Sequence, residues 1–108
     1  MTDPRTDKLA DVLVNYSTAV QPGEWVGILG DVAALPLLRA VYSAVVKAGG
    51  NPTLMLSDEM MTREFLRYAG DEQMAWLDPS HTLYYDTADV FIRCNAPTNT
   101  RAMTTIDA

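Results

Sequence analysis

The chain of 108 residues has one cysteine, one histidine, and only eight basic residues against fourteen acidic ones. A single cysteine excludes an internal disulfide, and a single histidine argues against a hydrolytic zinc site, which usually needs two or more. The net charge of -6, with scattered Lys and Arg, argues against a nucleic-acid surface. No apolar stretch is long enough for a signal peptide or a membrane span, so we expect a cytoplasmic protein.

The length allows one domain at most, covering residues 1–108, and such a domain buries roughly two-thirds of its unfolded surface around a single core. The sequence contains no internal repeat and no low-complexity tract. Its Pro and Gly positions mark turns and do not form an interdomain linker.

The first part of the chain predicts a helix that leads into a central strand. Asp3 or Thr6 can cap the helix, and Pro4 suits its first turn. A Pro-Gly-Glu turn from Pro22 then leads into a short apolar run that ends at Asp31, as in a strand buried on both faces. The apolar residues expected on one face of the helix are Leu9, Val12, Leu13, Tyr16 and Val20.

Residues 32–48 predict a second helix, with Asp31 as N-cap and a Gly-Gly pair closing it at Gly49. The apolar residues 53–56 predict a second strand, so the segment forms a right-handed βαβ unit with parallel strands. The only polar stripe of this helix consists of Arg39, Ser43 and Lys47. We therefore expect its apolar sides to need a cover beyond the sheet.

Further along, Ser57 is the expected cap of a third helix that runs to Gly70, and residues 71–77 and 79–86 predict two short helices. The latter has Asp78 as N-cap. Residues 89–94 predict a third strand, and residues 96–99 open a loop. The sequence thus predicts an α/β fold with a small parallel sheet of three or four strands flanked by helices, in a three-layer α/β/α-like arrangement.

Five segments, in this order and spacing, resemble the metallo-aminopeptidases of the aminopeptidase T type, a family of thermophilic leucyl aminopeptidases. They are residues 3–17 (DPRTDKLADVLVNYS), 22–24 (PGE), 47–52 (KAGGNP), 56–59 (LSDE) and 99–102 (NTRA). The resemblance runs nearly end to end. It implies that the chain is the N-terminal part of a longer aminopeptidase.

The resemblance also implies a chemistry that this chain does not carry itself. The family removes N-terminal amino acids from peptides with two divalent metal ions, commonly zinc or cobalt, held by Glu, His and Asp in a larger C-terminal part. No position here matches a family metal ligand, so we assign no catalytic, cofactor-binding or metal-binding residue and expect the chain alone to be inactive. The intact family protein is a dimer, and this domain would scaffold it and shape access to the metal centre.

Residues that could carry chemistry favour structural interpretations. His81 fits a solvated or capping role at a helix start, and Cys94 fits a small buried hydrophobe. Asp58 and Glu59 are better explained as acidic residues that stabilise the positive end of a helix dipole than as a pair of catalytic acids. The Gly27-x-x-Gly30 spacing only partly matches a phosphate-binding loop. The methionines at 55, 60, 61 and 74, with Trp76, favour core filling over a binding surface.

Two other functions stay open on the sequence alone. A free-standing module could bind a small ligand or a protein partner at the carboxyl ends of its parallel strands, near residues 29–33 and 56–59. A complete small hydrolase is disfavoured because the sequence offers no convergent nucleophile, base and metal groups.

Overall fold

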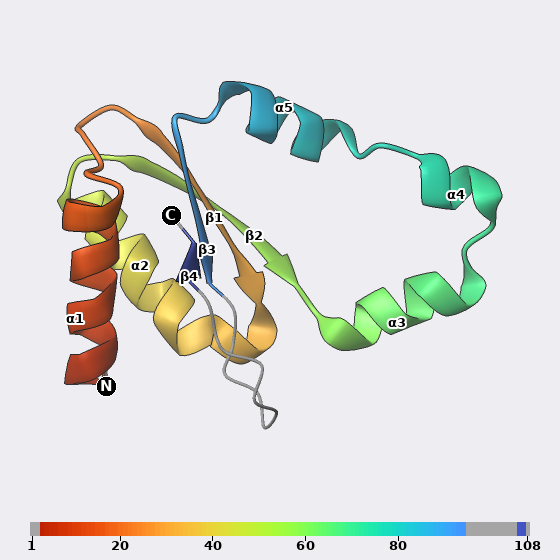
Figure 1. Ribbon diagram of the computed structural model, residues 1–108, viewed down its shortest axis with the longest axis horizontal. Helices are drawn as coiled ribbons and strands as arrows, with labels where there is room; N and C mark the ends of the chain where they lie inside the picture. Colours follow the sequence, from red (N-terminus) through yellow and green to blue (C-terminus); the bar gives the residue numbers. More distant parts are fainter. Residues whose placement is uncertain (1–2, 95–105, 108) are drawn as a thin grey trace.

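The computed structural model describes residues 3–94 and 106–107, in which helices alternate with strands. The first half contains α1 (Pro4–Val12), a π-helical turn (Leu13–Ser17), β1 (Trp25–Asp31), a 3-10 turn (Val32–Ala34), α2 (Leu35–Lys47) and β2 (Asn51–Ser57). The second half contains α3 (Glu59–Tyr68), α4 (Asp71–Ala75), α5 (Pro79–Thr87), β3 (Val90–Cys94) and β4 (Ile106–Asp107). Figure 1 shows their arrangement.

The strands form one sheet in the order β2-β1-β3-β4. β1 pairs in parallel with both β2 and β3, with Val26 opposite Pro52 on one side and Val90 on the other. β4 pairs antiparallel with β3. The prediction of a small parallel α/β sheet with a central first strand is therefore confirmed, and the described fourth strand adds an antiparallel edge.

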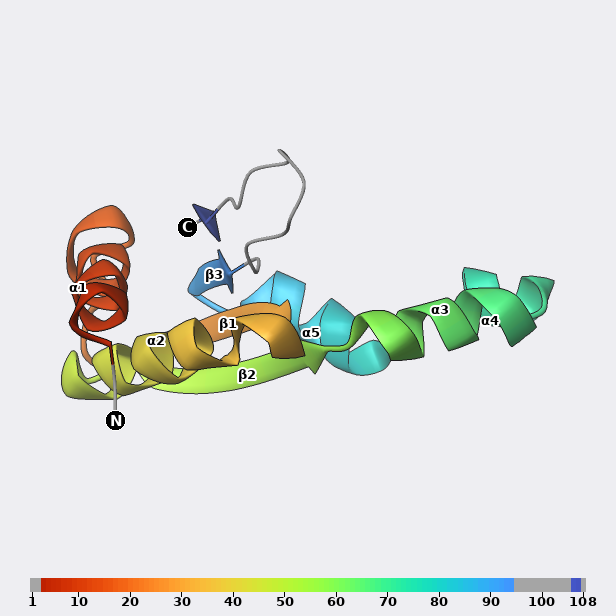
Figure 2. The same ribbon diagram turned by 90° about the horizontal axis from the view of Figure 1, so that it is seen from below.

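Helices cover the sheet from both faces. On one face, the alternating residues Val26, Ile28 and Ile92 are fully buried beneath the side chains of α2, Leu38 and Val41 among them. On the other face, Tyr84 of α5 is buried against Gly27. α1 packs on α2 (Figure 2). This gives the three-layer arrangement expected from the sequence.

The buried face of the first helix differs from the predicted one. Leu13 and Val20 are buried as expected, but Leu9 and Val12 are each 39% exposed and Tyr16 is 76% exposed. Ala10 and Val14 take the inward positions. The helix widens into a π-helical turn after Val12, which changes the angular spacing of the residues that follow. The buried residues Ala10, Leu13 and Val14 nevertheless keep the helical i, i+3, i+4 spacing, so the inward face already differs from the predicted one within α1, where the small Ala10 packs inward.

Aspartate side chains begin four of the helical segments. Asp3, Asp31 and Asp78 act as N-caps as predicted, each accepting a hydrogen bond from the backbone N–H two residues later. The prediction of Ser57 as cap of the third helix is wrong, because Asp58 accepts that bond from Met60. Ser57 is instead the last residue of β2.

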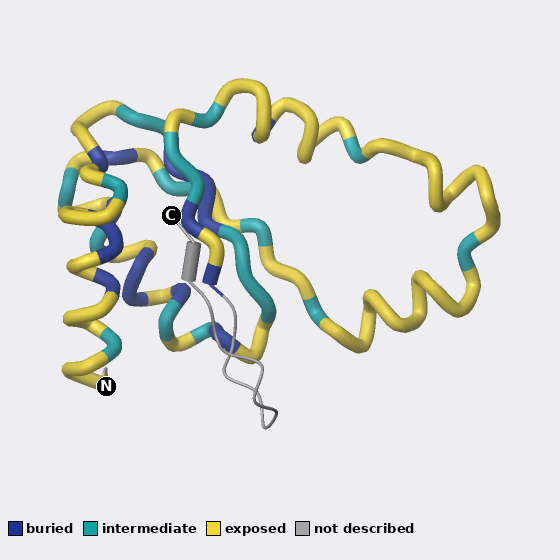
Figure 3. The backbone as a smooth tube through the Cα atoms, viewed as in Figure 1, coloured by how far each residue is buried: buried dark blue, intermediate teal, exposed yellow. Residues whose placement is uncertain are grey.

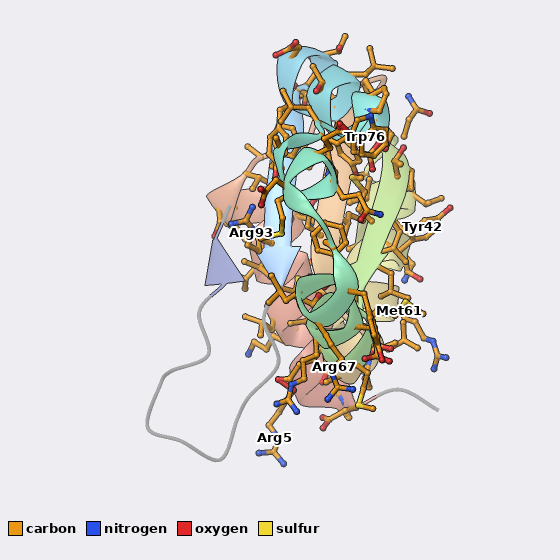
Figure 4. The ribbon with its side chains drawn as sticks, turned by 90° about the vertical axis from the view of Figure 1, so that its right-hand side faces the viewer. Arg5, Tyr42, Met61, Arg67, Trp76 and Arg93 are labelled. Carbon is orange, nitrogen blue, oxygen red and sulfur yellow. The ribbon has the colours of Figure 1, made fainter. Side chains whose placement is uncertain are left out.

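The connection between β2 and β3 leaves the sheet as a projecting arm, which we define as residues 59–77. Figures 1 and 2 show α3 and α4 extending beyond the end of the sheet, and Figure 3 shows the arm almost entirely exposed. Figure 4 labels Met61, Arg67 and Trp76 on it. The core-filling interpretation is wrong for Met60, Met61, Met74 and Trp76, which are exposed, whereas Met55 is half-buried in β2. The large apolar residues exposed on the arm are Met60, Met61, Phe65, Leu66, Tyr68, Met74, Trp76 and Leu77.

A second apolar surface lies where α2 meets the edge strand β2. Tyr42 and Val46 of α2 are 43% and 54% exposed, and Leu54 and Leu56 of β2 are 37% and 48% exposed. The described residues thus cover these four side chains only in part, in line with the expectation that the apolar sides of this helix need a further cover. None of the helices in the described residues is long and apolar enough to cross a membrane.

Candidate functional site

A cavity of about 680 Å³ opens at the carboxyl ends of the parallel strands, and we call it the carboxyl-edge pocket. In a parallel sheet the carboxyl ends of neighbouring strands meet at one edge, where α/β proteins commonly bind ligands. The end of β1 contributes Asp31, the end of β2 contributes Ser57, and β3 contributes Arg93. The full lining is Leu29, Gly30, Asp31, Leu54, Met55, Leu56, Ser57, Asp78, His81, Tyr85 and Arg93.

One wall of the pocket is held together by α5 and β3. The guanidinium of Arg93 donates a hydrogen bond to the Tyr85 hydroxyl over 3.2 Å. The Tyr85 ring stacks on Phe91 with 5.0 Å between ring centroids, and the His81 ring lies 6.2 Å from it. Stacking fixes the aromatic rings, so the Tyr85 hydroxyl and Arg93 form a positioned pair.

The two carboxylates of the pocket also serve as helix caps. Asp31 accepts from the Ala33 N–H at 2.9 Å, and Asp78 accepts from both the N–H and the hydroxyl of Ser80. The Ser80 hydrogen bonds, with a smaller contribution from His81, hold the pKa of Asp78 below its usual value. Asp78 is therefore ionised at neutral pH and brings a fixed negative charge to the pocket.

The neighbouring strand ends are tied together directly. The Ser57 hydroxyl donates to the Gly30 carbonyl oxygen over 3.3 Å, which links the end of β2 to the end of β1. Residues opposite each other in the register share a face of the sheet, so Leu29, Met55 and Arg93 lie on the α5 face. The pocket thus has an apolar floor with charged groups around it.

Sequence reasoning anticipated part of this pocket. Residues 29–33 and 56–59 were the predicted location, and Asp31 and Ser57 lie there. Asp78, His81, Tyr85 and Arg93 were not connected with it. A helix that connects two parallel strands begins at the carboxyl edge of the sheet. The predicted helix at residues 79–86 is followed by the predicted third strand, so its start, and with it His81, could have been placed at this edge from the sequence. His81 is exposed, as predicted for a solvated residue, and the cap is Asp78.

The glycine pair of β1 has a packing role. Gly27 and Gly30 lie within the strand and not in a loop, so the phosphate-binding loop that the sequence already disfavours is not formed by these residues. A Cβ on Gly27 would lie 2.1 Å from Tyr84 Cε1, and one on Gly30 would lie 2.7 Å from the Cys94 carbonyl oxygen. Each glycine allows a neighbour to approach the strand closely.

Cys94, Asp58 and Glu59, which the sequence also offers as candidates, lie outside the pocket. Cys94 is fully buried, and burial raises the pKa of its thiol to about 11, so it is a neutral thiol at physiological pH. Asp58 caps α3, and Glu59 pairs with Arg63 one turn later at 3.6 Å. Cys94 is thus buried as predicted, and Asp58 and Glu59 lie at the start of α3 as predicted.

A second polar cavity, of about 360 Å³, lies between α1 and α2. The predicted polar stripe of α2, Arg39, Ser43 and Lys47, forms one wall, and Asp7, Asp11 and Asn15 form the other. The floor consists of Ala40, Ala44 and Ala48. Opposite charges across the groove, with small residues beneath, favour the packing of α1 on α2.

A metal centre does not fit the described residues. Within residues 3–94, no three His, Cys, Asp or Glu side chains come together in a way that could hold a metal ion. Asp31, Asp78 and His81 share the carboxyl-edge pocket without forming such a group. We therefore derive no metal-dependent step from this part of the chain.

The sheet, its covering helices and the pocket at its carboxyl edge define a three-layer α/β domain. A family model described as thermophilic metalloprotease (M29) matches residues 2–108. The chain therefore belongs to this metalloprotease family, as the five sequence segments indicated. No curated protein matches the chain.

Proposed function

We propose that this domain is the non-catalytic N-terminal domain of a metal-dependent aminopeptidase. The observation that carries the proposal is the family match across residues 2–108. In addition, the polar and charged groups of the carboxyl-edge pocket form no metal-ligand cluster among the described residues. The two divalent metal ions would be held by another part of the protein. Here the domain would scaffold that part and shape the access of peptides to it.

A direct test compares the isolated chain with the longest reading frame that contains it. We expect no peptide hydrolysis by residues 1–108, with or without added zinc or cobalt ions. We expect hydrolysis that a chelator abolishes from the longer protein. Chelator-sensitive hydrolysis by the isolated chain would overturn the assignment of a non-catalytic domain, and so would a coding sequence past Ala108 without a Glu and His cluster.

The intact protein is also proposed to be a cytoplasmic homo-oligomer. The exposed apolar residues of the projecting arm and of the α2 and β2 surface support an interface, because large uncovered apolar patches are uncommon on monomers. Sedimentation of the isolated chain over a range of concentrations should show self-association. A monomer at every concentration would indicate that these surfaces are not sufficient for assembly.

The carboxyl-edge pocket favours a second function, the binding of a small ligand. It joins an apolar floor to charged groups from β1, β3 and α5, which is the usual composition of a small-molecule site. Its volume of about 680 Å³ also falls within the range of roughly 300–1,000 Å³ that such sites have. This function and the accessory role in an aminopeptidase are compatible.

A further inference from the structure

The projecting arm is attached to the body of the chain at the rim of the carboxyl-edge pocket. The chain enters the arm just after Ser57 and leaves it just before Asp78, and both of these residues line the pocket. Figure 1 shows the arm as an arc that runs from the end of β2 to the start of α5. The two attachment points of the arm therefore lie beside the same cavity.

Between its attachment points the arm interacts only with itself among the described residues. Its hydrogen bonds are those of α3 and α4, their caps, and the bond from the Gly70 N–H to the Gln73 side chain. Both of its ion pairs lie within α3. The joints with the body, Asp58 and residues 76–78, lie outside the helices. A segment that is held only at its ends can rotate about such joints while its helices stay intact.

α3 carries an apolar stripe that is open to solvent. Met61, Phe65 and Tyr68 follow the i, i+4, i+7 spacing of one helical face, and they are 71%, 47% and 72% exposed. The charged residues of the two ion pairs lie on the other sides of the helix. An amphipathic helix of a globular protein normally lies with its apolar stripe on an apolar surface. One side of α3 is therefore suited to packing that this conformation does not provide.

The carboxyl-edge pocket presents an apolar surface of its own. Leu29 and Met55 are half-buried on its floor, and Leu54 and Leu56 are 37% and 48% exposed at its rim. Contact between two apolar surfaces removes both from water, and the gain grows with the area covered. The stripe of α3 and the pocket are thus complementary in kind.

The stripe also begins close to the pocket along the chain. Its residues follow Ser57 by four to eleven positions. At about 1.5 Å per helical residue the stripe spans roughly 6–17 Å from the pocket rim, whichever direction the helix takes. A partner tethered at this range has an effective concentration of about millimolar, so the arm of the same chain has the advantage over the arm of a second copy.

We propose that the projecting arm is a hinged lid, which swings about Asp58 and residues 76–78 and lays the apolar stripe of α3 over the carboxyl-edge pocket of its own chain. The conformation described here is the open one. Closure covers the pocket floor and controls the entry of any ligand. The inference goes beyond the functions proposed above and is tested without a ligand or a substrate, so its failure leaves the assignment of a non-catalytic domain to the hydrolysis test.

Disulfide trapping detects the closed position. Met55→Cys on the pocket floor is combined in turn with Met61→Cys, Phe65→Cys and Tyr68→Cys on the stripe, because a disulfide needs Cα atoms within about 7 Å of each other. The native Cys94 is fully buried, and each single variant checks that it stays out of the reaction. We expect at least one pair to form a disulfide within the chain under mild oxidation. The absence of such a bond in all three pairs would overturn the proposal.

The matched control joins the same arm cysteine to Tyr16→Cys. Tyr16 is 76% exposed in the turn after α1, and neither α1 nor this turn lines the pocket. Corrected for the alkylation rate of each thiol, this pair should be oxidised about tenfold more slowly or less, since the lid raises the effective concentration only at the pocket. Equal rates would show an arm without a preferred position, and a disulfide between two chains would show docking on a second copy. Either result would contradict the lid.

Two further variants test the stripe itself. Phe65 and Leu66 are both exposed residues of α3, but consecutive residues of a helix point about 100° apart, so Leu66 lies off the stripe. In the chain with cysteines at positions 55 and 61, Phe65→Ser should slow disulfide formation about fivefold or more, because it removes apolar area that closure buries. Leu66→Ser should leave the rate unchanged. Equal effects of the two variants would contradict the role of the stripe.

A spin label provides a readout that leaves the pocket and the stripe intact. Glu72→Cys places the label on an exposed position of α4. Paramagnetic broadening falls off steeply with distance, so even a small closed population should broaden the amide resonances of Leu29 and Met55 and leave that of Lys8 in α1 unchanged. Broadening confined to the arm and α5 would overturn the lid. Spin-labelled chains mixed with isotope-labelled ones should broaden none of these resonances, and broadening there would assign the contact to a second copy instead.

Discussion

Gly27 of β1 lies directly beneath the ring of Tyr84, so closely that a Cβ on Gly27 would be 2.1 Å from Tyr84 Cε1. The same tyrosine stacks between Trp25 and Phe91, with ring centroids 5.6 and 5.5 Å away. Its hydroxyl donates a hydrogen bond to the Thr53 carbonyl oxygen of β2. This one side chain therefore fastens α5, and with it one wall of the carboxyl-edge pocket, onto the sheet.

Gly27→Ala should destabilise the fold by about 1–3 kcal/mol, because the added methyl overlaps the Tyr84 ring and one or both must shift. Urea denaturation measures the change. Gly70→Ala is the matched control, since no atom lies within 4 Å of a Cβ at that position and its φ is -87°. Equal stability of the Gly27→Ala protein would show that Tyr84 does not pack on the strand.

Tyr84→Phe should lower the free energy of unfolding by about 0.5–1.5 kcal/mol, because it removes the hydrogen bond to Thr53 but keeps the ring. Thermal unfolding followed by circular dichroism gives the difference. Tyr16→Phe, at a side chain that is 76% exposed, should leave the midpoint unchanged. The same loss in both variants would assign the effect to something other than the bond to Thr53.

Stability should fall as the pH rises from about 9 toward 11. Burial raises the pKa of Cys94 from its ordinary value of 9.0 to about 11, so the unfolded chain loses this proton first. The stabilisation is complete below pH 9.0 and is lost as the pH approaches about 11. Burial likewise raises the pKa of Tyr84, which adds to the loss in the same direction.

Unfolding free energies measured between these two pH values check this expectation. Cys94→Ala should reduce the loss of stability between these two pH values, although it lowers stability at neutral pH by leaving a cavity. The native thiol should also react slowly with iodoacetamide at pH 8 and rapidly in denaturant. Fast alkylation of the native chain would contradict the burial of Cys94.

Trypsin should cut the isolated chain first after Arg63 or Arg67 in the projecting arm. All residues of α3 are exposed, and its ion pairs, Glu59 with Arg63 and Glu64 with Arg67, lie in solvent where such pairs contribute little. Mass spectrometry of the first fragments identifies the sites. Arg39 and Lys47 of α2 serve as internal controls, and cleavage there first would show that the arm is the more stable part.

The order of helices and strands follows from the sequence because its signals are local. Asp3, Asp31 and Asp78 cap helical segments through bonds to residues two positions away, and Gly49 closes α2 with a φ of +88°. The apolar run of β1 identifies it as a central strand for the same reason, since burial on both faces removes the alternation. Such features need no knowledge of distant residues.

The tertiary structure alone determined which distant residues meet. Gly27 and Tyr84 are separated by more than half of the chain, and only the packing of α5 on the sheet explains the glycine. Arg93 and His81 join Asp31 in one pocket because β3 pairs in parallel with β1 and α5 begins at the same edge. The methionines of the arm show the converse. Methionine is a common core residue, so the sequence favours burial. These methionines are exposed because the chain leaves the sheet at the arm and no described element packs over it.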